Sequence, residues 1–195
     1  MNAGLNPHVA PDDAGPKPNF TEREFRNTLG MFPTGVSVVT SIHAGEPIAA
    51  TIGSFSSVSL EPPLVLFILA KNSKAYAAWA SVKHFAVNVL DRSQGDISTK
   101  FAKALTDKWD KVAPLPGSVT DTLLLPGALA WLECETYSHH DGGDHLIVLG
   151  RVLALSHCTG ANASPLVFYS GRYRSLLPID EDNLPREETW WIHGW

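Results

Sequence analysis

A polar run in the C-terminal half of the chain has the composition of a reactive site. The stretch SHHDGGDHLIVLGRV, residues 138–152, places three histidines, two aspartates and two glycines ahead of an apolar segment. Histidine and aspartate bind metal ions and move protons, while glycines permit a reversal of the chain. Three interpretations are open from these residues: a metal site, a site for an organic ligand, and a polar turn with a purely structural role.

The spacing of the three histidines does not match the common metal motifs. Helical zinc sites carry two histidines four residues apart, whereas His139, His140 and His145 stand on either side of a glycine pair that favours a hairpin turn. Side chains around such a turn point in several directions, so we expect no metal ion here. His139 and His140 are predicted to be surface residues of the turn.

A serine-rich segment is a candidate for contacting an anion. TIGSFSSVS, residues 51–59, offers five hydroxyl groups, and Gly53 permits a ligand to approach the backbone closely. Serines on the edge of a strand are also common as ordinary solvent-facing residues. Composition alone leaves both interpretations open: a site that contacts an anion, and serines that only face solvent.

A second polar cluster follows a pattern typical of a buried strand. In AKNSKAY, residues 70–76, Ser73 with Lys71 or Lys74 offers a hydrogen bond and a positive charge to a phosphate. A solvated turn that opens a helix is the alternative.

Composition excludes several classes of protein. The 195 residues are 44% hydrophobic and 18% charged, which indicates one soluble globular domain. A net charge of −5 with scattered Lys and Arg argues against nucleic-acid binding. The chain shows no signal-peptide pattern and no apolar run near the roughly 18 residues of a membrane span. With only two cysteines, a cytoplasmic location is expected.

Three segments divide the chain. Residues 1–19 are rich in Pro, Gly, Asn and Asp and are predicted to be a flexible leader, and residues 20–178 form the folded domain. Residues 179–195 are a tail with three tryptophans in its last six positions. We expect this tail to pack on the body or on a partner subunit, with a lid over the site as the alternative.

The first predicted element is a short helix. TEREFRNTLGMF begins with Thr21 and Glu24, a capping-box pair, and places Phe25 and Leu29 at helical spacing. The helix is predicted to end before Pro33. Further helices are predicted in KAYAAWASVK and DISTKFAKALTDKWDKV.

Strands dominate the rest of the chain. GVSVVTSI and EPIAATIGSFSSVSL are joined by a predicted hairpin turn at HAGE, and more strands are expected in PPLVLFIL, HFAVNVLD, ALAWLECETYSHH, DHLIVLGRVLALSH and SPLVFYSGRYRSL. About six strands and two or three helices, without regular alternation, favour a mainly antiparallel β-barrel over a doubly wound sheet.

Five segments, in the same order, resemble the flavin reductase family of FMN-binding split-barrel proteins, the reductase components of two-component flavin monooxygenases. They are FPTGVSVVT, ATIGSFSSVSLEPPLVLFIL, HFAVNVL, GDHLIVLGRV and PLVFYSGRYRSL, and the resemblance spans about residues 22–176. It implies a split antiparallel β-barrel with short flanking helices, present as a homodimer that binds flavin beside the subunit interface.

The resemblance also assigns roles to residues. Flavin-binding positions would be Pro33, Thr34, Thr51, Ser54, Phe55, Ser56, Ser57, Val58, Asn72, Ser73 and Tyr173. In the Gly-Asp-His turn, Asp144 would order the turn and His145 would face the nicotinamide, while Arg172 would lie at the rim. The chain departs from the family at Gly53, where Asn is frequent, and at Ala75, where Thr is common.

The implied reaction is hydride transfer from NADH or NADPH to FMN or FAD, with the reduced flavin supplied to a separate monooxygenase. Such a reaction needs stacked rings rather than a protein nucleophile or metal, which agrees with a site of hydroxyls, backbone amides and one histidine. Two alternatives remain: a flavin-binding electron carrier or sensor that has no nucleotide turnover, and a non-enzymatic module that holds a partner protein through its Trp-rich tail.

Overall fold

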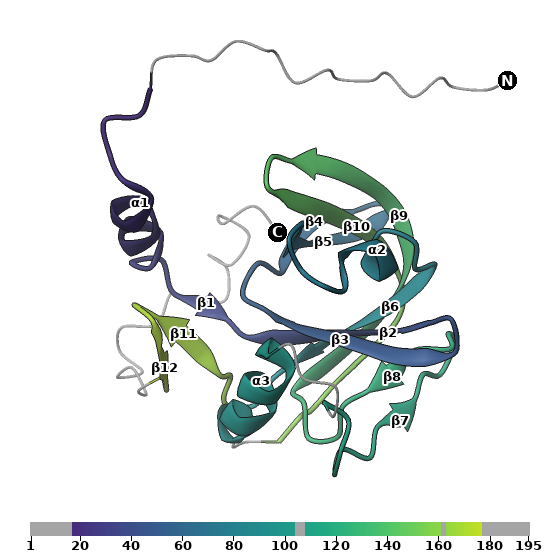
Figure 1. Cartoon of the computed structure of the whole chain (residues 1–195). Coiled ribbons are helices and arrows are strands. Elements are labelled where there is room, and N and C mark those ends of the chain that lie inside the picture. The colour runs from purple at the N-terminus through teal and green to yellow at the C-terminus, as the bar shows by residue number, and fades with distance from the viewer. Residues whose placement is uncertain (1–16, 104–107, 161–162, 177–195) are drawn as a thin grey trace, which may run out of the picture.

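The computed structural model describes residues 17–103, 108–160 and 163–176 (Figure 1). The predicted tail at 179–195 and most of the predicted leader lie outside these residues. Within them, no helix is both long enough and apolar enough to cross a membrane.

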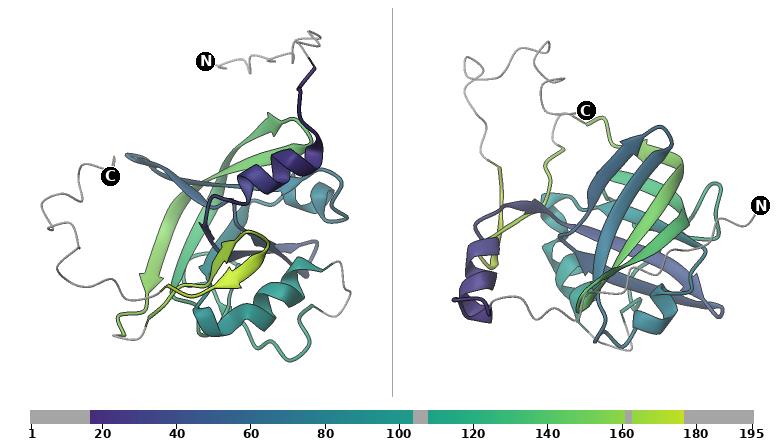
Figure 2. Two further views of the ribbon diagram at one scale, coloured as in Figure 1. Left: turned by 90° about the vertical axis from the view of Figure 1, so that its left-hand side faces the viewer. Right: turned by 90° about the horizontal axis from the view of Figure 1, so that it is seen from above.

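A seven-stranded antiparallel sheet forms the body of the protein. Its strand order is β3-β2-β6-β9-β10-β5-β4, and Figure 2 shows the sheet curving around its core. The strands are β2 (Ser37–His43), β3 (Glu46–Ile52), β4 (Ser56–Leu60), β5 (Pro63–Ala70), β6 (His84–Val89), β9 (Ala130–Gly142) and β10 (His145–His157). The prediction of a mainly β, antiparallel fold is therefore confirmed.

The core inside this sheet is built from aromatic and β-branched side chains. Phe67 of β5 packs edge-on against Phe85 of β6 and against Trp79, with ring centroids 5.0 and 5.6 Å apart. All three rings are at most 1% exposed. Trp79 lies in α2 (Tyr76–Trp79), so this single helical turn closes one end of the core.

Gly150 allows β10 to cross directly over this core. A Cβ atom at Gly150 would lie 2.3 Å from Cζ of Phe85 and 3.1 Å from Cβ of Cys134. Both neighbours are fully buried and have no space into which to move. Glycine is thus required at this position by close packing.

A small sheet lies apart from the main one and joins the two ends of the described chain (Figure 2). Its order is β1-β11-β12, from β1 (Thr34–Gly35), β11 (Val167–Tyr169) and β12 (Arg172–Arg174). The turn between β11 and β12 also contacts the first helix, since the Ser170 N–H donates to the Gly30 carbonyl at 2.9 Å.

The first helix, α1 (Glu22–Leu29), begins as predicted. Thr21 and Glu24 form the reciprocal capping box, in which Glu24 N–H donates to Thr21 Oγ1 at 3.2 Å and Thr21 N–H to Glu24 Oε2 at 2.7 Å. Its apolar residues, however, do not enter the core. Phe25 is 50% and Leu29 is 56% exposed.

A buried carboxylate fastens the loop that precedes β9. Glu133 is 3% exposed and accepts hydrogen bonds from the backbone or hydroxyl groups of Ser118, Val119 and Thr120, with five such contacts between 2.5 and 3.2 Å. Burial opposes ionisation, but these donors outweigh it and lower the pKa of Glu133 to about 2. The loop connects a two-stranded ladder of β7 (Leu115–Pro116) and β8 (Leu123–Leu124).

Several predicted elements need correction. The expected single strand EPIAATIGSFSSVSL is divided into β3 and β4 by residues 53–55. The helix expected over DISTKFAKALTDKWDKV is only α3 (Gly95–Ala102), preceded by the 3-10 turn Arg92–Gln94, and the chain adopts turns at 108–111. The main sheet has seven strands where about six were predicted for the chain, because the segment EPIAATIGSFSSVSL supplies two of them.

Candidate functional site

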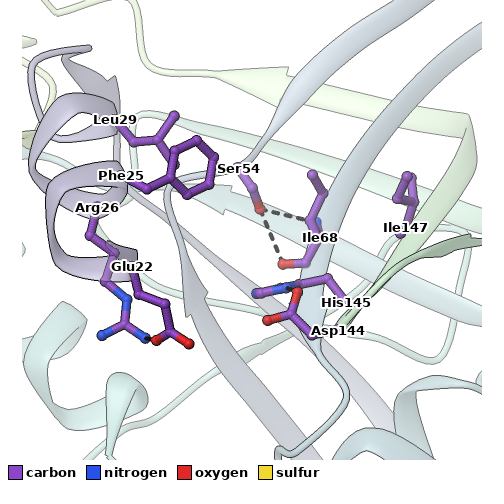
Figure 3. A pocket seen from close by; sticks show the side chains of 10 residues that line it. Glu22, Phe25, Arg26, Leu29, Ser54, Ile68, Asp144, His145 and Ile147 are labelled. Atoms are coloured by element: carbon purple, nitrogen blue, oxygen red, sulfur yellow. Dashed lines mark hydrogen bonds and ion pairs between the residues drawn. The ribbon is translucent and has the colours of Figure 1, made fainter. Parts of the chain in front are cut away.

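A cleft separates α1 from the main sheet (Figure 3). Its volume of about 660 Å³ falls within the range that accommodates cofactor-sized ligands. One wall is α1 and the other is formed by the facing ends of β5 and β10. The lining residues are Glu22, Phe25, Arg26, Leu29, Ser54, Ile68, Gly142, Asp144, His145 and Ile147.

The Gly-Asp-His turn places His145 on the sheet side of this cleft. Gly143 and Asp144 form a two-residue hairpin turn between β9 and β10, and Gly143 takes the positive φ of 77° that the first position of a type II′ turn requires. His145 is the first residue of β10 and pairs with Ala70, the last residue of β5. The predicted turn is therefore confirmed, in a tighter form.

Asp144 orients the His145 ring. Its Oδ1 lies 2.6 Å from His145 Nδ1, and the side chain of His145 is 42% exposed. This hydrogen bond, with the charges of His145 and, to a smaller extent, of Arg26, lowers the pKa of the Asp144 carboxyl. When the Nδ1 atom donates to the carboxylate, Nε2 is left to accept from a ligand.

The other two histidines do not join this site. His139 and His140 were predicted in the turn, but they belong to β9, where they pair with Val148 and Ile147. Both residues have regular strand geometry because the turn between β9 and β10 contains only two residues. His140 Nε2 lies 2.8 Å from Ser138 Oγ, so its hydrogen-bond partner is a residue of the same strand.

No metal cluster forms from these residues. In the part of the chain that the structure describes, no three His, Cys, Asp or Glu side chains are close enough to hold a metal ion.

Asn72 and Ser73 lie beside the turn that carries His145. They follow β5, and the preceding residue donates its N–H to the Asp144 carbonyl at 2.9 Å. Ser73 Oγ accepts from Ala75 N–H at 3.3 Å, and Asn72 is exposed. Both residues follow the end of a strand, as predicted, but neither is among the residues that line the cleft.

Lys71 is already engaged with the protein. Its Nζ lies 2.8 Å from Asp141 Oδ1, and this contact lowers the pKa of the Asp141 carboxyl. As a counter-charge for a phosphate, Lys71 therefore competes with an internal partner.

Ser54 lies at the floor of the cleft and joins two parts of the fold. Its Oγ accepts from the Ile68 N–H at 3.0 Å and donates to the Ile68 carbonyl at 3.2 Å, as Figure 3 shows. These bonds satisfy the backbone of β5 where β4 no longer pairs with it. One lone pair of Ser54 Oγ is left for a ligand.

The remaining residues of the serine-rich segment follow the edge of the main sheet. Ser56 and Ser57 pair with Leu66 and Val65, and a β-bulge occurs at Val58, which is 44% exposed. Phe55 packs against the core. These four residues, Phe55 to Val58, are not among those that line the cleft.

A second group of predicted residues gathers around Ser98 of α3. Thr51 Oγ1 donates to the Ser98 carbonyl at 2.6 Å, and Tyr173 Oη donates to Ser98 Oγ at 2.8 Å. Thr34 lies close to Gly53, where an added Cβ atom would be 2.9 Å from Thr34 Oγ1. Gly53, at the position where the family frequently has Asn, thus leaves space for the hydroxyl group of Thr34.

Two predicted positions lie on the surface near this second group. Pro33 is exposed immediately before β1, and Arg172 is exposed at the start of β12. Tyr173 is 39% exposed and packs edge-on against Phe168, with ring centroids 5.7 Å apart.

The sequence did not point to the α1 wall of the cleft. The segment was predicted only as a short helix, and no ligand-binding role was assigned to the residues that form this wall: Glu22, Phe25, Arg26 and Leu29. Their spacing of i, i+3, i+4 and i+7 does identify one face of a helix, but it cannot tell a core-facing surface from a ligand-facing one. The open space beside α1 is what distinguishes them.

Comparisons with known proteins find one matching family and several relatives of this chain. The family description "Flavin reductase like domain" matches residues 29–177. The chain is 39% identical over 156 residues to the reductase subunit HsaB of a flavin-dependent monooxygenase from Mycobacterium tuberculosis, covering 80% of this chain and 83% of the relative. It is 41% identical over 156 residues to the FMN reductase (NADH) SmoA of Agrobacterium fabrum, covering 77% and 84%.

A solved structure shows the same fold. The Streptomyces globisporus NADH:FAD oxidoreductase SgcE6, solved in complex with NAD and FAD fragments, superposes with a TM-score of 0.75 at 36% identity. The match covers 80% of this chain and 93% of that one.

Proposed function

Because this chain belongs to the flavin reductase-like family, we propose that it transfers a hydride from a reduced nicotinamide nucleotide to free FMN or FAD and that a separate monooxygenase consumes the reduced flavin. The observation that carries this proposal is the cleft that His145 lines together with residues of α1. Relatives named as NADH-dependent reductases favour NADH as the reductant.

The residues of the cleft fit planar aromatic ligands. Phe25 and Leu29 on one side and Ile68 and Ile147 on the other provide apolar surfaces that bind rings. The polar groups are the hydroxyl of Ser54, the Asp144–His145 pair and the Glu22–Arg26 ion pair of α1. A bound flavin supplies the hydride acceptor and the reduced nicotinamide supplies the donor.

The protein's own contribution is positioning. His145, oriented by Asp144, would hydrogen-bond the nicotinamide side of the reductant through Nε2 and hold its ring against the acceptor. Asn72 and Ser73, at the neighbouring strand end, would contact the flavin phosphate. The remaining predicted flavin-binding residues are Pro33, Thr34, Thr51, Ser54, Phe55, Ser56, Ser57, Val58 and Tyr173.

A steady-state assay that crosses FMN and FAD with NADH and NADPH tests this proposal. The purified protein is expected to oxidise NADH at a rate that depends on added flavin. The absence of flavin-dependent oxidation with either nucleotide would refute the proposal and would leave an electron carrier or a non-catalytic binding module in its place.

We also propose that the protein is a cytoplasmic homodimer. The exposed apolar residues that follow α1, Met31 and Phe32 at 60% and 74% exposure, support a second subunit. Two free cysteines support a reducing compartment. Cell fractionation and sedimentation velocity measure these properties, and a monomer at micromolar concentration would contradict the dimer.

A further inference from the structure

We propose that Arg26 of α1 binds the pyrophosphate of the reductant, so that the N-terminal helix forms one wall of the nucleotide site. This inference rests on the proposed function and adds a binding residue to it. It begins from the face that α1 presents to the cleft, which consists of Glu22, Phe25, Arg26 and Leu29 (Figure 3).

The cleft face of α1 has the layout of a dinucleotide-binding surface. Phe25 and Leu29 are apolar and half exposed, and none of the residues of α1 is buried against the described protein. The charged residues Glu22 and Arg26 lie beside them, one helical turn apart. An aromatic ring attached to a phosphate chain can match both parts.

Arg26 is the residue of the cleft lining that always carries a positive charge. The other charged groups are the carboxylates of Glu22 and Asp144, and His145 is occupied with Asp144. The guanidinium has five N–H donors in a planar fork that suits phosphate oxygens. Of the described residues, Arg26 has an ion-pair partner in Glu22 alone, through Nη2 at 3.4 Å with side chains 77% and 89% exposed.

The contact with Glu22 is weak enough to be exchanged for a ligand. Exposed ion pairs on a helix contribute little to stability, because solvent screens both charges. Arg26 is also close enough to the opposite wall for its charge to contribute to the lowered pKa of Asp144. A nucleotide whose nicotinamide lies at His145 would therefore have its phosphates within the field of Arg26.

The fold holds α1 in place for this role. The Gly30 N–H donates to the Arg26 carbonyl at 2.9 Å and ends the helix, while the Gly30 carbonyl accepts from Ser170 N–H in the small sheet. The wall is thus attached at its C-terminal end.

The first test compares Arg26→Ala with Arg23→Ala. Arg23 lies on the same helix, loses the same charge and does not line the cleft. We expect R26A to raise the KM for NADH about tenfold or more, the loss of one charge-assisted hydrogen bond, with kcat and the flavin Kd within about twofold of wild type. R26K should recover part of the loss, and R23A should behave as wild type.

A second measurement isolates the phosphate. ADP should inhibit NADH oxidation by the wild type more strongly than adenosine does, and R26A should abolish this difference. The inference is overturned if R26A leaves KM unchanged, if it raises the flavin Kd instead, or if ADP and adenosine inhibit the wild type equally. Failure of the wild type to oxidise NADH at all would instead refute the proposed function.

Discussion

His145 occupies the meeting point of three structural features. It begins β10, follows a two-residue turn and opens onto the cleft with its ring held 2.6 Å from Asp144. A strand end gives a side chain a fixed direction, and the adjacent carboxylate selects which ring nitrogen faces the ligand. These constraints make His145 suited to positioning a nicotinamide.

Replacing His145 with alanine tests this role. We expect kcat/KM for NADH to fall about tenfold, since one hydrogen bond to the reductant is lost, while flavin affinity stays within about twofold. Steady-state kinetics and flavin titration measure the two effects separately. His140→Ala is the control, because His140 lies on the same hairpin but not in the cleft. An equal loss of flavin affinity would assign His145 to the other ligand.

At the scale of single residues, the sequence predicted local chemistry better than spatial grouping. The capping box of Thr21 and Glu24 and the tight turn at Gly143 depend on neighbours in the chain, so their patterns are readable. Ser54 and Tyr173, by contrast, hydrogen-bond to residues 14 and 75 positions away. Such partners depend on the completed fold.

Two elements of this protein, β9 and α3, end at positions other than those predicted. The segment SHHDG continues β9 because β10 pairs with it as far as Gly142, so the turn is shorter than predicted and excludes His139 and His140. The predicted third helix stops at Ala102, although Lys-rich sequence continues beyond it. Lys103 adopts an extended conformation at the end of this helix, and Trp109 packs its ring against Phe101 with centroids 5.0 Å apart.

The loop before β9 depends on one carboxylate, which makes fold stability sensitive to acid. The pKa of Glu133 is lowered from 4.5 to about 2 in the folded state. Its ionised form therefore contributes stability above pH 4.5, on the order of 3 kcal/mol, and this contribution is lost as the pH falls from about 4.5 toward 2.

Glu133→Gln is expected to lower the free energy of unfolding at pH 7 by about 3 kcal/mol, and the gap to wild type should shrink as the pH falls below 4.5. Urea unfolding of both proteins at pH 7, 4 and 3 measures this difference in the free energy of unfolding. Glu135→Gln is the control: it lies two residues along the same strand and makes an exposed ion pair with Arg151, so its effect should be within about 1 kcal/mol. A gap that does not change with pH would contradict this role for Glu133.

The whole molecule is a curved sheet with a helix held apart from it, and the cleft exists because of that separation. α1 is fixed through the small sheet that pairs β1 with β11, so residues near both ends of the described chain place one wall of the site. Segment order and strand character were enough to predict the family fold. The separation of α1 from the body follows from the small sheet, in which Thr34 pairs with Phe168 and Gly35 with Val167, far apart in the sequence and without a local pattern.

Hydride transfer from NADH to free flavin is tested most directly by an anaerobic reaction. Equimolar NADH and FMN, or NADH and FAD, are mixed with a catalytic amount of this protein. Hydride transfer between the two predicts that the visible absorbance of oxidised flavin is lost mole for mole with NADH, at a rate proportional to protein concentration. Flavin absorbance that persists while NADH is consumed, or a rate no faster than that without protein, would contradict hydride transfer from NADH to flavin by this protein.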